Sequence, residues 1–181
     1  PGHLVIIPTY NERENISDII DAVQSLDRSF DLLIVDDGSP DGTADLVREA
    51  MLKYPGAINL EERSGKLGLG TAYVHGFRYA MSQGYDFVYE MDADFSHNPN
   101  DLLRMAEVLE HDRADMVIGS RYVKEGKLEN WPLDRIFLSY GASLYVRLVT
   151  GLPVKDPTAG FVAYKSKVLE SIDLSKIESI G

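Results

Sequence analysis

The sequence predicts a single α/β domain in which helices flank a central, mostly parallel sheet. Short apolar runs alternate along the chain with segments whose apolar residues fall at helical spacing, and that alternation is typical of parallel sheets. The runs are continuously apolar, as expected for strands that are buried on both faces. A length of 181 residues is that of one ordinary domain with one substantial core.

The expected elements follow one another in order. The clearest strands are residues 4–7 (Leu-Val-Ile-Ile) and 32–35 (Leu-Leu-Ile-Val), and shorter ones are expected at residues 57–60, 87–89, 116–118 and 160–164. Helices are predicted over residues 16–26, 46–51 and 71–81, over a segment that ends at Leu109, and over residues 136–149. Asn98 and Pro99 are expected to be the N-cap and first-turn proline of the helix that ends at Leu109. Residues 126–130 are expected to form a loop.

Polar residues follow several of the predicted strands. In an open parallel sheet, the ligand crevice lies beyond the carboxyl ends of the strands. Four polar clusters stand at such ends: residues 8–12, 36–39, 92–96 and 120–121. We therefore expect these clusters to converge on one edge of the sheet and to form the site.

Composition excludes several classes of protein. The formal net charge of −11 argues against a nucleic-acid-binding protein and against broad adsorption to anionic lipid. The lack of cysteine excludes a disulfide framework and a thiolate metal site, and it fits a reducing compartment. No stretch approaches the roughly 20 apolar residues that span a bilayer, and no signal peptide precedes the first predicted strand.

Asp92 and Asp94 are the strongest candidates for chemistry. Residues two apart in an extended segment point the same way, so both carboxylates can face one cation. Hard oxygen ligands suit Mg²⁺ or Mn²⁺, and such ions keep waters and bind substrate phosphates. The alternative interpretation is a pair of solvated aspartates at a strand end. His97 follows closely enough to be a secondary candidate.

Two further segments have both a functional and a plain interpretation. Residues 36–39 (Asp-Asp-Gly-Ser) fit either a turn or carboxylate recognition of a base or ribose. Residues 65–70 (Gly-Lys-Leu-Gly-Leu-Gly) precede a predicted helix, where free amide groups and Lys66 favour an anion. A tight turn explains that spacing equally well, because it matches neither a P-loop nor a dinucleotide-binding fingerprint.

Arg121 and Arg135 are the most informative cations. Arginine is suited to bidentate recognition of phosphate, and Arg121 follows a predicted strand on the edge that carries the acidic pair. This position predicts a second anion bound opposite the metal site. Ordinary ion pairing with one of the many carboxylates is the alternative.

These residues, in this order, resemble the inverting family 2 glycosyltransferases of the GT-A (Rossmann-like) fold, and more narrowly the polyprenyl (dolichyl) phosphate mannosyltransferases. Residues 7–12, 35–43 and 92–94 carry the likeness to the broad family. Residues 65–73 and 94–97 carry the likeness to the narrower branch, and residues 119–122 and 156–161 extend it. The resemblance implies that residues 1–181 are a glycosyltransferase catalytic domain that continues past Gly181.

The resemblance also implies roles for particular residues. Donor contacts are implied at Pro8, Tyr10, Glu12, Val35, Asp37, Asp92, Ala93 and Asp94. The implied metal-binding residues are Asp92, Asp94 and Ser96, and the residues that hold the acceptor phosphate are Arg121, Arg135 and Ser139. Asp94 and Arg121 are the implied catalytic residues.

The implied reaction moves mannose from GDP-mannose to a polyprenyl phosphate with the help of Mg²⁺ or Mn²⁺. The acidic base that family 2 enzymes use has no clear counterpart here, but a phosphate acceptor is already anionic and needs positioning more than deprotonation. A lipid acceptor implies peripheral work at the cytoplasmic face of a membrane. Two departures concern the substrates: Val162 and Tyr140 stand where family members often carry cations, and the donor-clamping Arg and Lys would lie beyond Gly181.

Other functions remain as alternatives at this point. Within the same class, the chain is also compatible with a polyprenyl-phosphate glucosyltransferase or another family 2 enzyme that uses a UDP-sugar. A sugar nucleotidyltransferase would share the sheet and the acidic metal site, but it would want a glycine-rich loop where residues 8–12 stand. A non-catalytic nucleotide-binding subunit is the third alternative.

Overall fold

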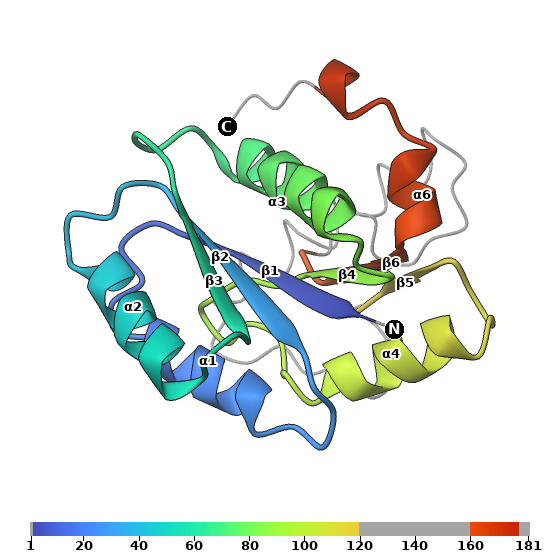
Figure 1. Cartoon of the computed structure of the whole chain (residues 1–181), viewed down its shortest axis with the longest axis horizontal. Helices are drawn as coiled ribbons and strands as arrows, with labels where there is room; N and C mark the ends of the chain where they lie inside the picture. The colour runs from blue at the N-terminus through green and yellow to red at the C-terminus, as the bar shows by residue number, and fades with distance from the viewer. Residues whose placement is uncertain (1, 120–159, 178–181) are drawn as a thin grey trace, which may run out of the picture.

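A computed structural model describes residues 2–119 and 160–177, and it confirms the α/β architecture (Figure 1). The sheet has six strands in the order β3-β2-β1-β4-β6-β5. The strands are β1 (His3–Thr9), β2 (Asp31–Asp36), β3 (Ile58–Glu62), β4 (Phe87–Glu90), β5 (Met116–Ile118) and β6 (Val162–Lys165). The pairs β1–β2, β1–β4 and β2–β3 are parallel, whereas β6 runs antiparallel to both β4 and β5. The sheet is therefore mostly parallel, as predicted.

Helices cover both faces of the sheet (Figure 1). The helices are α1 (Ile16–Gln24), α2 (Thr43–Lys53), α3 (Leu69–Gln83), α4 (Asp101–Glu110), α6 (Ser166–Glu170) and the 3₁₀ turn η1 (Leu174–Lys176). Helices α1, α2 and α4 lie on one face, and α3 and α6 lie on the other. The two layers of helices bury the sheet between them, which explains why its central strands are continuously apolar.

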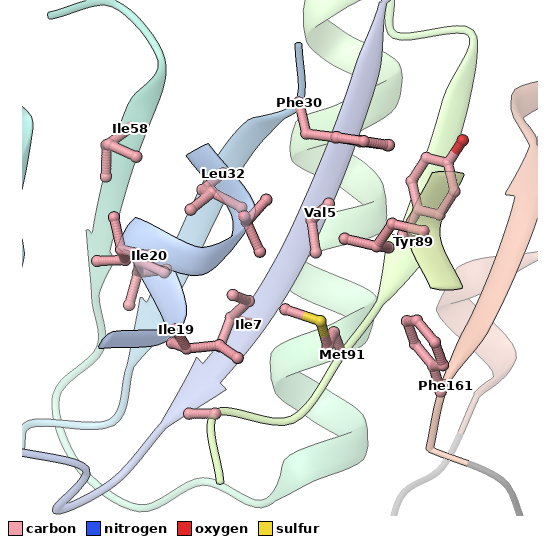
Figure 2. Packing of buried hydrophobic residues seen from close by; sticks show 14 of the residues in the cluster. Val5, Ile7, Ile19, Ile20, Phe30, Leu32, Ile58, Tyr89, Met91 and Phe161 are labelled. Carbon is pink, nitrogen blue, oxygen red and sulfur yellow. The ribbon is translucent and has the colours of Figure 1, made fainter. Parts of the chain in front are cut away.

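Strand geometry divides the core into two clusters. Successive residues of a strand point to opposite faces of a sheet. Val5 and Ile7 of β1 therefore pack toward α1, α2 and α4, while Leu4 and Ile6 pack toward α3. Figure 2 shows the first cluster continuing across the sheet through Tyr89 and other labelled side chains. All four β1 side chains are fully buried, so β1 is the centre of the fold.

The main difference from the expected elements concerns the start of α4. The predicted N-cap, Asn98, lies in a turn before the helix, and Asn100 occupies the cap position instead. The Asn98 side-chain oxygen accepts a hydrogen bond from the Asn100 backbone amide at 3.0 Å. The asparagine side chain thus stabilises a turn that leads into the helix. The short elements α6 and η1 have no predicted counterpart, because a few residues carry no readable period.

Several expected features lie outside the described residues, namely the loop at residues 126–130, the helix at residues 136–149 and the polar cluster at residues 120–121. Within residues 2–119 and 160–177, no helix is long and apolar enough to cross a membrane.

Gly76 gives a test of how closely α3 packs on β1. A Cβ atom at Gly76 would lie 2.6 Å from Cγ2 and 2.7 Å from Cδ1 of the fully buried Ile6. Overpacking of this kind costs about 1–3 kcal/mol, which exceeds the roughly 1 kcal/mol that alanine gains over glycine inside a helix. We expect Gly76→Ala to lower the free energy of unfolding in urea by about 1 kcal/mol. Gly65→Ala is the control, because a Cβ there meets nothing within 4 Å; equal stability of the two variants would contradict the packing.

Candidate functional site at the carboxyl edge of the sheet

The ends of β1 and β2 are joined side by side. Pro8 pairs with Val35 and Thr9 pairs with Asp36 in the strand register. The Thr9 hydroxyl donates a hydrogen bond to Asp36 Oδ1 at 2.8 Å, and both residues are buried. Beyond the strands, the Asn11 amide donates to Ser39 Oγ at 2.9 Å. The first two polar clusters therefore converge on one edge, as predicted.

Tyr10 and Glu12 follow β1 at this edge. The Tyr10 ring is 39% exposed, and Lys66 Nζ lies 4.9 Å from its centroid in a cation–π contact. The Glu12 carboxylate accepts a hydrogen bond from Asn15 Nδ2 at 3.0 Å, and its backbone amide donates to Thr43 Oγ1 at 3.0 Å. These contacts fix the segment that leads from β1 into α1, and they bring Lys66 of the glycine-rich segment next to Tyr10.

Asp37 is held by a buried ion pair with Arg63. Arg63 Nε donates to Asp37 Oδ1 at 2.6 Å, and the two side chains are only 9% and 8% exposed. Asp37 Oδ2 accepts a hydrogen bond from the Leu67 backbone amide at 3.1 Å. Gly38 follows with a φ of 68°, and a Cβ there would lie 3.3 Å from the Arg63 carbonyl oxygen. Glycine is therefore required beside this pair.

Arg63 also holds the glycine-rich segment in place. Its Nη1 donates to Thr71 Oγ1 at 2.8 Å, and its Nη2 donates to the Gly68 carbonyl oxygen at 3.2 Å. One guanidinium thus connects the end of β2 with the start of α3, where the glycine-rich run ends. We call Asp37, Arg63, Leu67, Gly68 and Thr71 the Asp37–Arg63 clasp. The sequence analysis did not assign any role to Arg63.

The acidic segment 92–96 begins just after β4. Met91 and Ala93 are buried in the cluster on the side of α1 and α4, as Figure 2 shows for Met91. Asp92 is half-buried, and its Oδ1 accepts a hydrogen bond from the Tyr73 hydroxyl of α3 at 3.3 Å. Tyr73 belongs to the cluster on the other face of the sheet. Asp92 therefore points to the opposite face from Met91 and Ala93, as successive residues of a strand do.

Asp94 lies at the exposed end of this segment. Its Oδ1 accepts hydrogen bonds from both the backbone amide and the hydroxyl of Ser96, the amide at 3.0 Å. The structure therefore brings together two of the three residues that were expected to bind a metal. The contact fixes Asp94 Oδ1 and leaves the exposed carboxylate facing solvent.

The donor set fits a hard divalent cation that shares its coordination with a substrate. Among residues 2–119 and 160–177, no group of three or more His, Asp or Glu side chains is placed to hold a metal. Asp92 and Asp94 alone would leave most positions of a Mg²⁺ or Mn²⁺ ion open. These ions commonly use one or two carboxylates and fill the remaining positions with water and phosphate oxygens. An ion held by these two carboxylates would complete its coordination with water and with the oxygens of a diphosphate.

Glu90, the last residue of β4, is a carboxylate that the sequence analysis did not consider. Its pKa is raised to about 7, chiefly by burial and also by the nearby Asp92 carboxylate, against the opposing effect of a hydrogen bond from Tyr164. Tyr164 Oη donates to Glu90 Oε1 at 2.9 Å across the antiparallel pair of β4 and β6. At neutral pH Glu90 is thus only partly ionised and does not add a full second charge beside Asp92.

Two residues at this edge adopt left-handed backbone conformations without being glycine. Asn11 has a φ of 59° and Phe95 has a φ of 57°. Asparagine tolerates this region, but for a bulky residue such as Phe95 it is strained by about 1–3 kcal/mol. Both residues stand in the segments that follow the central strands. Strain of this kind concentrates at functional sites, which agrees with the placement of the site here.

The region beyond β5 is only partly described. The Gly119 amide donates to the Phe161 carbonyl oxygen at 2.8 Å, and His97 stacks on the Phe161 ring at a centroid distance of 5.0 Å. Phe161 therefore connects the acidic segment with the end of β5. Three expected acceptor-phosphate residues, Arg121, Arg135 and Ser139, lie outside the described residues.

Comparison with known sequences gives a consistent picture. The profile of glycosyl transferase family 2 matches residues 4–173. The chain is 47% identical over 178 residues to the polyprenol monophosphomannose synthase of Mycolicibacterium smegmatis, a match that covers 98% of this chain and 67% of that protein. It is 39% identical to the dolichol-phosphate mannosyltransferase of Pyrococcus furiosus, over 96% of this chain and 49% of that protein. The chain thus spans from about half to about two thirds of these relatives.

Solved structures share the fold. The mannosyltransferase PcManGT from Pyrobaculum calidifontis, in complex with GDP-Man and Mn²⁺, superposes with a TM-score of 0.67 at 22% identity, over 96% of this chain and 47% of that one. The glucosyl-3-phosphoglycerate synthase from Mycobacterium tuberculosis, with Mn²⁺ and UDP, has a TM-score of 0.68 at 20% identity, over 94% and 59% of the two chains. These likenesses place the fold among the GT-A glycosyltransferases.

The Asp37–Arg63 clasp can be tested by its contribution to stability. Arg63→Met would leave the buried Asp37 carboxylate without its cation, and breaking a buried pair in this way costs about 3–5 kcal/mol. We expect urea unfolding to show a loss of that size, and we expect Asp37→Asn combined with Arg63→Met to recover part of it. Arg78→Met, on the exposed surface of α3, is the matched control and should change stability by less than about 0.5 kcal/mol. A loss no larger than that of the control would show that the clasp does not hold the edge.

Proposed function

The chain belongs to glycosyl transferase family 2, and we propose that it is an inverting mannosyltransferase that moves mannose from GDP-mannose to a polyprenyl (dolichyl) phosphate. The product is polyprenyl-phosphate mannose. One observation carries the proposal: the identity of 47% to a polyprenol monophosphomannose synthase over 98% of this chain. The site supports it, because the ends of β1 and β2 and the acidic segment after β4 lie at the same edge of the sheet.

The donor is proposed to bind across the ends of the three central strands. Pro8, which is half-buried, can contact the nucleoside together with the exposed Tyr10 ring, while the neighbouring Val35 is fully buried and would support Pro8 from within the core. The backbone at Ala93 and the carboxylates of Glu12 and Asp37 complete the proposed donor contacts. Asp37 is already bound to Arg63, so its role toward the donor is that of a rigid, oriented acceptor.

The metal is proposed to bind at Asp92 and Asp94, with Ser96 beside it. A bound Mg²⁺ or Mn²⁺ ion would offset the diphosphate charge and stabilise the leaving GDP. Ser96 keeps Asp94 in place through the two hydrogen bonds to Oδ1. The complex of PcManGT with GDP-Man and Mn²⁺ supports this use of the fold, and the choice between the two ions remains for experiment.

The transfer itself is proposed to be a single in-line displacement. An oxygen of the lipid phosphate attacks the anomeric carbon of mannose, the bond from that carbon to the diphosphate oxygen breaks, and the electron pair leaves with GDP. No proton needs to be removed, since the acceptor is an anion at neutral pH. Arg121, with Arg135 and Ser139, is proposed to hold the acceptor phosphate, and Arg121 and Asp94 are the proposed catalytic residues. The lipid acceptor would place the reaction at the cytoplasmic face of a membrane.

Turnover with defined substrates tests this function. The protein is incubated with Mn²⁺ and a short polyprenyl phosphate, with GDP-mannose or UDP-glucose in parallel, and lipid-linked sugar is measured. We expect product from GDP-mannose, and we expect Asp94→Ala to lower the rate at least about 100-fold, because electrostatic stabilisation by a metal is worth several kcal/mol. Glu49→Ala, an exposed carboxylate on α2, should leave the rate unchanged.

The outcomes separate the candidates. Product from UDP-glucose alone would replace mannose by glucose and keep the mechanism. A failure of both donors, or an Asp94→Ala variant as active as the Glu49→Ala variant, would contradict the proposed function.

A further inference from the structure

Tyr73 lies near the start of α3, and its hydroxyl reaches Asp92 at the start of the acidic segment 92–96. Its side chain is 7% exposed and stacks on Phe77 at a centroid distance of 6.4 Å, so the ring belongs to the core. Its hydroxyl is the polar exception, since it lies 3.3 Å from Asp92 Oδ1. The hydroxyl is the donor of this hydrogen bond, because an ionised carboxylate can only accept.

Gly160 lies on the other oxygen of the same carboxylate. A Cβ atom at Gly160 would be 3.0 Å from Asp92 Oδ2 and 3.7 Å from Asp92 Cγ. A methyl group at this position would therefore press on the Asp92 carboxylate.

The two contacts restrict how Asp92 can turn. Asp92 stands two residues after the end of β4, next to Met91, whose backbone amide still donates to the Ile6 carbonyl oxygen at 3.1 Å. The Tyr73 hydroxyl on Oδ1 and the close approach of Gly160 to Oδ2 both limit the orientations open to the carboxylate. Partners that hydrogen-bond to a ligating carboxylate orient it toward the metal, and their removal typically lowers metal affinity 10- to 100-fold.

We propose that Tyr73 and Gly160 are positioning residues for the metal site: Tyr73 orients the Asp92 carboxylate through its hydroxyl, and Gly160 leaves room for that orientation. The inference rests on the proposed function, because it takes Asp92 as a ligand of the divalent cation. Neither residue touches the substrates in this account. Their effect reaches the reaction only through the position of Asp92.

A hydroxyl at the opposite edge of the sheet provides a matched control. Tyr85 follows the end of α3, and its Oη donates to Asp31 Oδ2 at 2.8 Å at the start of β2. Tyr85→Phe therefore removes a tyrosine-to-carboxylate hydrogen bond of the same kind, far from the acidic segment. A loss of stability that Tyr73→Phe and Tyr85→Phe share can then be separated from a loss of metal affinity that only Tyr73→Phe shows.

The experiment measures the binding of Mn²⁺ in the presence of GDP by the electron paramagnetic resonance signal of the free ion. We expect Tyr73→Phe to raise the dissociation constant for Mn²⁺ about 10-fold or more, and Gly160→Ala to raise it in the same direction. Tyr85→Phe should bind Mn²⁺ as the wild type does. In turnover, Tyr73→Phe should raise the Mn²⁺ concentration needed for half-maximal rate, while saturating Mn²⁺ restores most of kcat.

Each contrary result has a distinct meaning. If the wild type binds Mn²⁺, Asp94→Ala does not, and Tyr73→Phe matches Tyr85→Phe, the positioning role is overturned and the proposed function stands. If the wild type itself fails to bind Mn²⁺ with GDP, the metal site of the proposed function is overturned, and the inference with it. A Tyr73→Phe variant that loses kcat at every Mn²⁺ concentration, with unchanged Mn²⁺ affinity, also overturns the positioning role.

Discussion

The parallel pairing of β1 with β2 and with β4 is the constraint on which the site depends. Because all three strands run in the same direction, their carboxyl ends meet at one edge, and every residue that follows a strand there becomes a neighbour of the others. The Thr9–Asp36 hydrogen bond closes the buried end of this arrangement at 2.8 Å. The position of the candidate site is thus a consequence of strand direction, which the helices on both faces hold fixed.

Two sets of side-chain contacts fix the irregular segments that follow the strands. The Asp37–Arg63 clasp binds the end of β2 to the start of α3, and the Tyr73 hydroxyl binds the same helix to Asp92 after β4. Helix α3 therefore connects the region proposed for the nucleoside with the region proposed for the metal. A shift of this helix along the sheet would therefore move side chains in both regions at once.

Much of the fold and part of the site could be predicted from local pattern. The sequence pattern predicted the continuous apolar runs of β1 and β2 and the acidic residues directly after β2 and β4. Such features can be predicted because strand burial and strand ends determine residue types over a few neighbouring positions. The convergence of residues 8–12 with residues 36–39 followed from strand direction alone. The start of α4 was misplaced because a turn residue and a helix cap have the same chemistry at Asn98.

The contacts that orient the site could not be predicted in the same way. Arg63 meets Asp37 across 26 positions and Tyr73 meets Asp92 across 19, and no period links such residues. Tyr73 falls at a core position of a helix, where an aromatic residue is expected for packing alone. Gly160 has a role only when the carboxylate beside it is known. Side-chain contacts between distant segments thus need three-dimensional placement.

The left-handed backbone at Phe95 has a consequence for engineering. A glycine at this position would relieve the strain and should raise thermal stability, since glycine populates this region freely. The same change would loosen the peptide that joins Asp94 to Ser96, because the added freedom favours many conformations of the chain. Stability and activity would then be traded against each other at a single residue. A search for thermostable variants that screens only for melting temperature would therefore act against the proposed metal site at this position.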